Sequence, residues 1–393
     1  MKRFYLLLAV AAALLLLASC NSPLGGYVTV KATGADAAAY RQGDEDWISA
    51  DNPEDFSFWA LGPYEVAVRC GDTVNVLALT PDIGNPMISC DTGNRVGFSV
   101  SYNISAVNGA AKAALYYRAG VASGTGTSGT ISASNAIPGL QDIVLVAEDS
   151  NGDPIAAKMI TENVINGASY SMTMSSSDTG NILAGGRLDD FSASVPAGWT
   201  LNGALTASVT PHGTTVLTKF MNSSGGTYDS FTFADYDVVT LFAKQKATPP
   251  YLTLSRIVVG TDKALHFTAP LPAVFNATMQ HDYLPTFSGL SYAGEGLVGF
   301  HLQARWGGYV ISALVSTDFL KGATSYEIPD LIDLDGFEDF MPNSGDTVTT
   351  AAEAICSNKS FAEMAGVPLN SKPTVLKGLD LRIAGDVEQY TAP

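Results

Sequence analysis

Five acidic side chains lie within ten residues near the end of the sequence and form its densest group of potential metal ligands. They are Asp330, Asp333, Asp335, Glu338 and Asp339. Calcium binds about six to eight oxygen atoms, and a calcium loop with glycine at its sixth position carries acids at the first, third and fifth. With Gly336 at the sixth position, Asp333 and Asp335 fall at the third and fifth, but Leu331 and Pro342 occupy the first and twelfth. A solvated acidic turn is the favoured interpretation, and Asp333 and Asp335 are the calcium candidates.

Nucleophilic chemistry has one partial motif. Ser291 lies in Gly289-Leu290-Ser291-Tyr292-Ala293, one residue short of the Gly-x-Ser-x-Gly elbow, which needs a strand before it and a helix after it. Gly294-Glu295-Gly296 follows instead, so Ser291 is interpreted as a loop serine. The four histidines are scattered without metal-ligand spacing, and His301 is expected to be solvated on the polar face of a strand. We assign no catalytic residue, no metal ligand beyond the calcium candidates and no cofactor.

The sequence leaves two kinds of carbohydrate site as alternatives. A pair of carboxylates could hydrolyse a glycosidic bond, but the sequence does not indicate which two would face each other. Exposed aromatic rings could form platforms for sugars, although large aromatic side chains more often fill the core. The aromatic candidates are Trp47, Trp59, Trp199, Trp306 and the pair Tyr116-Tyr117.

The use of cysteine agrees with export to an oxidising compartment. Cys70 ends a segment of alternating apolar residues, and Cys90 ends a second short apolar segment twenty positions later. We expect these two to form a disulfide, which would stabilise the fold by roughly 3 kcal/mol on the chain-entropy model. The alternative is a pair of buried free thiols. Cys356 is left over and is expected to be buried and unreactive.

Strands and tight turns dominate the pattern. The strongest signal is the alternating segment 300–306, the turn Gly307-Gly308 and the segment 309–315, which predict a hairpin. Further hairpins are predicted at 143–147 with 155–160 and at 206–209 with 216–220. Short helices are expected only at 349–355 and 360–365. The predicted fold class is all-β, with tandem β-sandwich-like domains and a few short helices near the C-terminus.

The first twenty residues have the three-part layout of a secretory signal peptide. Lys2 and Arg3 precede an apolar run from Phe4 to Leu17, and the segment ends Leu17-Ala18-Ser19-Cys20. Leu-Ala-Ser-Cys resembles the lipobox of bacterial lipoproteins. The resemblance implies cleavage before Cys20, a diacylglyceryl group on its thiol and acylation of the new amino terminus. Asn21, where an aspartate would favour the inner membrane, implies the outer membrane.

Turn-rich segments suggest the boundaries of the remaining chain. Residues 1–19 are the expected signal peptide and 20–26 a short tether. A small disulfide-bearing β unit is expected at 27–91 and a β-sandwich-like module at 92–174, unless 27–174 form one domain. A linker at 175–180 then leads to a larger β-rich domain at 181–393.

Composition and charge exclude some classes of function but do not identify the ligand or substrate. The chain has 21 basic and 38 acidic side chains, a net charge of −17, and only 15% charged residues. Such an acidic chain repels phosphate backbones, so nucleic-acid binding is excluded as an expectation. The sequence predicts an envelope lipoprotein, held to the membrane by its lipid and facing the periplasm or the surface. Its ectodomain is expected to bind a protein or a glycan, or to be structural, rather than to be an enzyme; the alternative is a polysaccharide-acting hydrolase.

Overall fold

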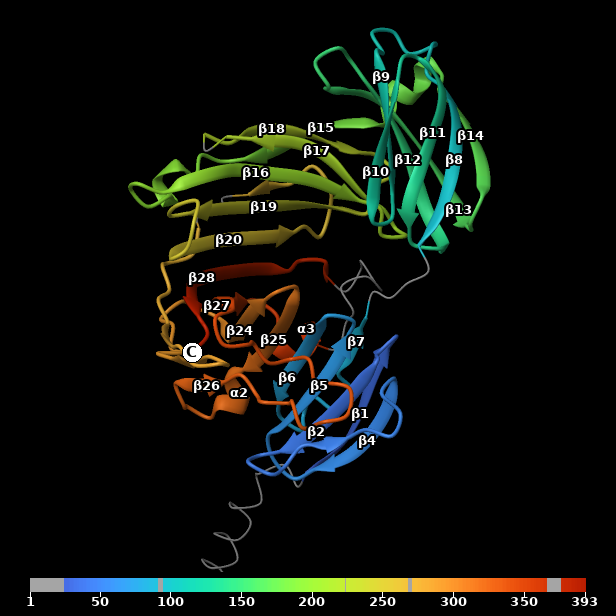
Figure 1. Cartoon of the computed structure of the whole chain (residues 1–393). Coiled ribbons are helices and arrows are strands. Elements are labelled where there is room, and N and C mark those ends of the chain that lie inside the picture. The colour runs from blue at the N-terminus through green and yellow to red at the C-terminus, as the bar shows by residue number, and fades with distance from the viewer. Residues whose placement is uncertain (1–24, 91–94, 223, 268–270, 366–375) are drawn as a thin grey trace, which may run out of the picture.

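A computed structural model describes residues 25–90, 95–222, 224–267, 271–365 and 376–393 (Figure 1). Its regular secondary structure is almost entirely β-strand, which confirms the predicted all-β class. Cys20, the expected site of lipid attachment, lies outside the described residues. Within them, no helix is long and apolar enough to cross a membrane.

One curved twelve-stranded sheet runs through the molecule and carries strands from both ends of the chain (Figure 1). In spatial order the strands are β17 (Thr215–Met221), β16 (Thr200–Val209), β19 (Tyr236–Lys244), β20 (Tyr251–Val259), β28 (Asp380–Thr391), β27 (Thr347–Ser357), β24 (Leu297–Trp306), β25 (Tyr309–Ser316), β6 (Thr73–Leu79), β5 (Tyr64–Cys70), β2 (Ala37–Gln42) and β3 (Ile48–Ser49). All neighbours are antiparallel except β25 and β6, which are parallel. The expected units 27–91 and 181–393 therefore share this sheet.

The inner face of the sheet carries the main core. Side chains at alternate positions, such as Phe300, Leu302 and Ala352, are fully buried there. The cover consists of the small sheet β22 (Thr278–Gln280), β23 (Thr286–Ser288) and β26 (Ser325–Glu327), together with loops and the sheet β18 (Gly226–Phe231), β15 (Ile182–Leu188) and β21 (His266–Phe267). The short helices of the described chain are α2 (Thr317–Leu320), α3 (Phe361–Ala365), η2 (Ser176–Asn181) and η3 (Ser192–Ser194).

The outer face of the sheet is covered only in part. At the β5–β6 end it packs against a three-stranded sheet of β4 (Asp55–Ala60), β1 (Gly26–Thr33) and β7 (Met87–Ser89). The two layers enclose Val28, Phe58, Tyr64 and Leu79 as a second core. The chain thus builds a small sandwich from the first unit and one end of the large sheet.

Residues 96–173 form a separate β-sandwich. One sheet contains β11 (Ser128–Ala136), β8 (Val96–Asn103) and β14 (Ala168–Thr173), and the other contains β10 (Gly120–Thr125), β9 (Lys112–Tyr117), β12 (Gly139–Glu148) and β13 (Pro154–Val164). Val100, Leu115, Ile131 and Leu145 fill the space between them. The predicted sandwich architecture is confirmed.

Local patterns predicted the hairpins well and one helix badly. The predicted hairpins correspond to β24–β25, β12–β13 and β16–β17, and the helix expected at 360–365 is α3. The helix expected at 349–355 is wrong, because these residues form the middle of β27. Val348, Thr350, Ala352 and Ala354 alternate into the core between β24 and β28, and this packing overrides the helical preference of the alanines.

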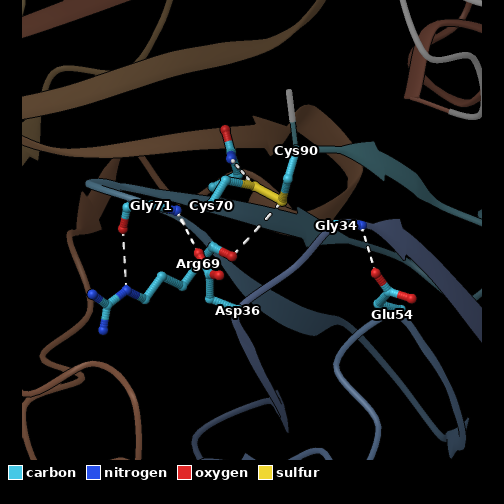
Figure 2. Close-up of a disulfide and its surroundings, with 8 residues drawn as sticks. Gly34, Asp36, Glu54, Arg69, Cys70, Gly71 and Cys90 are labelled. Carbon is cyan, nitrogen blue, oxygen red and sulfur yellow. Dashed lines mark hydrogen bonds between the residues drawn. A yellow bond between two sulfur atoms is a disulfide. The ribbon is translucent and has the colours of Figure 1, made fainter. Parts of the chain in front are cut away.

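The predicted disulfide between Cys70 and Cys90 is present, with 5.0 Å between the two Cα atoms. Figure 2 shows it beside Arg69, whose carbonyl oxygen lies 3.7 Å from the Cys90 Sγ. Cys70 ends β5 of the large sheet, whereas Cys90 follows β7 of the covering sheet. The bond therefore joins the two layers of the small sandwich. Cys356 is a buried free cysteine, and burial raises the pKa of its thiol.

Replacing both disulfide cysteines by serine should lower the free energy of unfolding by roughly 3 kcal/mol, because the unfolded chain regains the freedom of the closed loop. Urea unfolding of the two proteins measures the difference. A reductant should bring the wild type down to the level of the variant, whereas Cys356→Ala should keep its sensitivity to reductant. A wild type whose stability is the same with and without reductant would contradict the stabilising role.

Candidate functional site

The acidic segment 330–339 is organised by the core beneath it. Leu331, Phe337 and Phe340 are buried and Leu334 is half-buried, and successive turns link these four residues at intervals of three. The positions between them face the solvent, and Asp333 and Asp335 are both exposed there. Among the described residues, no group of three or more His, Cys, Asp or Glu side chains is arranged to hold a metal ion.

A hollow of about 430 Å³ lies beside this segment. Its lining includes Glu338, Asp339, Trp306 and Tyr309, so it brings together two of the acidic residues and one of the tryptophans singled out in the sequence. Trp306 is only 3% exposed and packs in the main core, so its ring does not form a platform for a sugar.

A larger groove of about 470 Å³ lies on the outer face of the large sheet, beside the sandwich module. Its floor is aliphatic and comes from five neighbouring strands of the large sheet, β17, β16, β19, β20 and β28, and from Leu379 just before β28. The floor residues are Leu205, Leu217, Val238, Ile257, Leu379 and Leu381. Arg118, Ala119 and Ile137 of the sandwich form its opposite wall. A concave, mostly apolar surface of this volume is typical of a binding site.

Contacts between the sandwich and the large sheet position that wall. Asp142 on β12 is fully buried and accepts hydrogen bonds from Thr161 Oγ1 at 2.6 Å and from the backbone N of His212 at 2.9 Å. His212 Nδ1 lies 3.0 Å from the same carboxylate, and His212 belongs to the turn between β16 and β17. Burial alone would raise the pKa of Asp142, but these hydrogen bonds outweigh it and the pKa is lowered.

Each of the four histidines lies against a carboxylate. The pairs are His212 with Asp142, His266 with Asp189, His281 with Glu388 and His301 with Glu353. His301 was expected to be solvated on the polar face of its strand; about a quarter of its side chain is exposed, and both ring nitrogens also have hydrogen-bond partners. Ser291, the serine of the partial elbow motif, lies in a loop beside a shallow hollow of about 270 Å³.

Two carboxylates on β28 form one pair to consider as the acid and base of a hydrolase. Asp386 and Glu388 are two residues apart and share one face of the strand. Burial, with a contribution from the Glu388 carboxylate, raises the pKa of Asp386 to about 6 although the backbone N of Ala277 donates to it. However, Asp386 is only 7% exposed, so a polymeric substrate does not reach it and we assign it no catalytic role.

Comparisons with known proteins do not place the chain in a family. No family model matches it, and no curated protein matches it. Among solved structures, a Ca²⁺-stabilised adhesin with which an Antarctic bacterium binds ice is 9% identical over 94% of this chain and 98% of that chain, with a TM-score of 0.16. The FN1–FN3 domains of chicken CNTN1 are 8% identical over 75% of this chain and 88% of that chain, also with a TM-score of 0.16. TM-scores this low carry no argument about fold or function.

Asp386→Asn should stabilise the protein at pH 8. The raised pKa means that the folded state binds more protons than the unfolded state between pH 3.8 and about 6, so the wild type loses stability as the pH rises through this window. A shift of this size corresponds to about 3 kcal/mol at most. Urea unfolding should show this gain for the variant at pH 8 and little of it at pH 4.

The same change at the exposed Asp335 serves as the control and should leave the free energy of unfolding unchanged. An Asp386→Asn protein that is destabilised at pH 8, or equally stabilised at both pH values, would contradict the prediction. It would show that ionisation of the buried carboxyl group does not lower the stability of the folded protein.

Proposed function

We propose that the protein is a lipid-anchored lipoprotein of the bacterial cell envelope whose ectodomain binds a protein partner. The groove of about 470 Å³ on the outer face carries the binding part of the proposal. The Leu-Ala-Ser-Cys sequence before residue 21 carries the anchoring part, and Asn21 favours the outer membrane.

An exposed aromatic patch near the tether supports the anchoring. Tyr27 and Trp59 lie directly opposite each other on β1 and β4, with 63% and 53% of their surfaces exposed, and Leu61 is 77% exposed. A Cβ atom at Gly25 would lie 2.7 Å from Trp59 Nε1, so the chain enters the first sheet against this tryptophan. Five residues span at most about 18 Å, which keeps the patch close to a membrane that holds Cys20. Tyrosine and tryptophan suit the membrane–water interface because their rings are apolar and carry one polar atom.

The chemistry of the groove favours a protein over a glycan. Its floor is formed by leucine, isoleucine and valine side chains, which match apolar side chains of a partner. Tyr236 is the one aromatic residue among the groove residues that the structure describes, whereas a glycan site would present several rings. The alternative, a hydrolase of polysaccharides, has weaker support, since Asp386 of the carboxylate pair that resembles its machinery is buried.

Cys20→Ala tests the anchor. The wild type should fractionate with the outer membrane and the variant should be released, since a single chain binds only marginally whereas two or more acyl chains hold a protein firmly. Protease added to intact cells then distinguishes a surface-facing from a periplasm-facing protein. A variant that stays as firmly membrane-bound as the wild type would refute lipid anchoring.

Leu217→Arg tests the groove with the uncharged, apolar fluorophore Nile red as the probe. The wild type should bind it saturably, and the variant should lose about tenfold or more in affinity, because a leucine contact is worth about 1.5–3 kcal/mol. Phe220→Arg is the matched control, since Phe220 lies on the same strand and is 65% exposed but does not line the groove. Equal losses in both variants, or no saturable binding, would contradict the proposed site.

A further inference from the structure

A serine, a histidine and a glutamate from three neighbouring strands form a hydrogen-bonded row on the outer face of the large sheet. Ser312 lies on β25, His301 on β24 and Glu353 on β27. His301 Nε2 is 2.8 Å from Ser312 Oγ, and His301 Nδ1 is 2.7 Å from Glu353 Oε2. This is the order in which a base activates a serine hydroxyl and an acid orients the base.

Strand register explains why the three side chains meet. His301 pairs directly with Glu353, so their side chains leave the sheet as close neighbours. Ser312 lies diagonally to His301, because His301 pairs with Leu314, and an imidazole ring spans that diagonal. On the far side, Glu353 pairs with Gly385, where a Cβ atom would come within 3.0 Å of Glu353 Cγ. The glycine therefore leaves room for the carboxylate.

The hydrogen bonds also define the working tautomer of the histidine. A carboxylate only accepts, so Nδ1–H donates to Glu353. Nε2 is then the lone-pair nitrogen and accepts the Ser312 hydroxyl proton. About a quarter of each of the His301 and Glu353 side chains is exposed, so the row is open to a solute.

Two amide side chains flank the serine. Gln303 on β24 and Asn75 on β6 are the register partners of Ser312 on either side, and all three lie on the outer face. Backbone N–H groups in the middle of a sheet are used by the strand ladders, so a developing oxyanion needs side-chain donors here. An amide nitrogen carries two hydrogens, and Asn75 Nδ2 has one contact in the structure, to Cys70 Sγ at 3.5 Å.

An apolar surface adjoins the same serine. Leu314 is two residues from Ser312 and shares its face of the strand, and it packs against the core that contains Phe361 and Leu77. Leu314 would offer a short acyl chain an apolar contact beside Ser312. The floor of the groove lies farther along the outer face, on β16, β17, β19, β20 and the first residues of β28, and it shares no residue with the row, so the two features are separate.

We propose that Ser312, His301 and Glu353 form an acyl-transfer site that hydrolyses carboxylic esters with short acyl groups, an activity beyond the proposed binding function. Ser312 Oγ attacks the ester carbonyl carbon while its proton passes to His301 Nε2. The carbon–oxygen bond of the ester breaks, and the leaving alkoxide takes that proton and departs as the alcohol. Water then attacks the acyl-serine with His301 again as the base, which releases the carboxylic acid and restores Ser312. Glu353 is the positioning residue.

Labelling of the full-length wild-type protein by a fluorophosphonate gives a direct test. The probe reacts with an activated serine, and the test does not depend on a variant that must fold. Mass spectrometry should find one adduct, on Ser312, which replaces fluoride by the serine oxygen. Ser255 lies on the same sheet and should remain unlabelled. The absence of an adduct on Ser312 would overturn the proposal.

Hydrolysis of p-nitrophenyl butyrate gives the second readout. Ser312→Ala should abolish turnover above background, and His301→Gln should reduce it by about 10²–10⁴-fold. Glu353→Gln should lower kcat with KM unchanged, a split that a purely structural role would not produce. His281→Gln is the matched control, because His281 also binds a carboxylate, Glu388, at 2.9 Å. Turnover that survives in Ser312→Ala, or falls equally in His281→Gln, would overturn the proposal.

Discussion

The parallel pairing of β6 with β25 is the constraint on which the rest of the structure depends. Residues 310–315 pair with residues 73–78, more than two hundred positions away along the chain. In the spatial order of the sheet, this is the ladder that joins β2, β3, β5 and β6 to the eight strands from residue 200 onward. Ordering two segments so far apart has a large entropic cost, which the buried side chains on both faces must offset.

That one ladder brings the pieces of the outer face together. It sets Asn75 beside Ser312 and Leu77 beside Leu314, so polar and apolar neighbours of the hydroxyl come from the other end of the sequence. It also brings the covering sheet of β4, β1 and β7 close to the hydrogen-bonded row of Ser312, His301 and Glu353 (the serine row), because that sheet packs on β5 and β6. The disulfide then holds the cover to the end of β5.

A second, smaller constraint gives the groove its far wall. Val216 and Phe231 pack against Tyr116 and Val144 of the sandwich, but apolar contacts of this kind tolerate sliding. The buried carboxylate of Asp142 does not tolerate such sliding. Each of its hydrogen bonds has a preferred direction, and the loss of a partner would leave the carboxylate unsatisfied. The turn that carries His212 is therefore held at one place on β12, and the wall that carries Arg118 and Ile137 faces the aliphatic floor.

The sequence predicts local pairings because their signals lie within a few residues. Alternation around Gly307-Gly308 is sufficient for the β24–β25 hairpin, and the expected export of the chain is sufficient for Cys70–Cys90. The alanines of β27 led to a wrong prediction of a helix, since their burial in a sheet depends on neighbours from two distant strands. The serine row escapes prediction for the same reason. Nothing in the letters around Ser312, His301 or Glu353 indicates which strands are adjacent or in which register.

The net charge and the exposed aromatic patch limit the ways in which this protein could be attached to a membrane. A net charge of −17 repels anionic headgroups, so electrostatic attraction would not bring the ectodomain to a bilayer. The patch of Tyr27, Trp59 and Leu61 is instead uncharged and amphipathic, and it lies where the tether enters the fold. Under the proposed lipidation of Cys20, the acyl chains supply the affinity and the patch restricts the orientation. The first sheet then lies nearest the membrane, and the outer face that carries the groove and the serine row is presented in a limited range of directions.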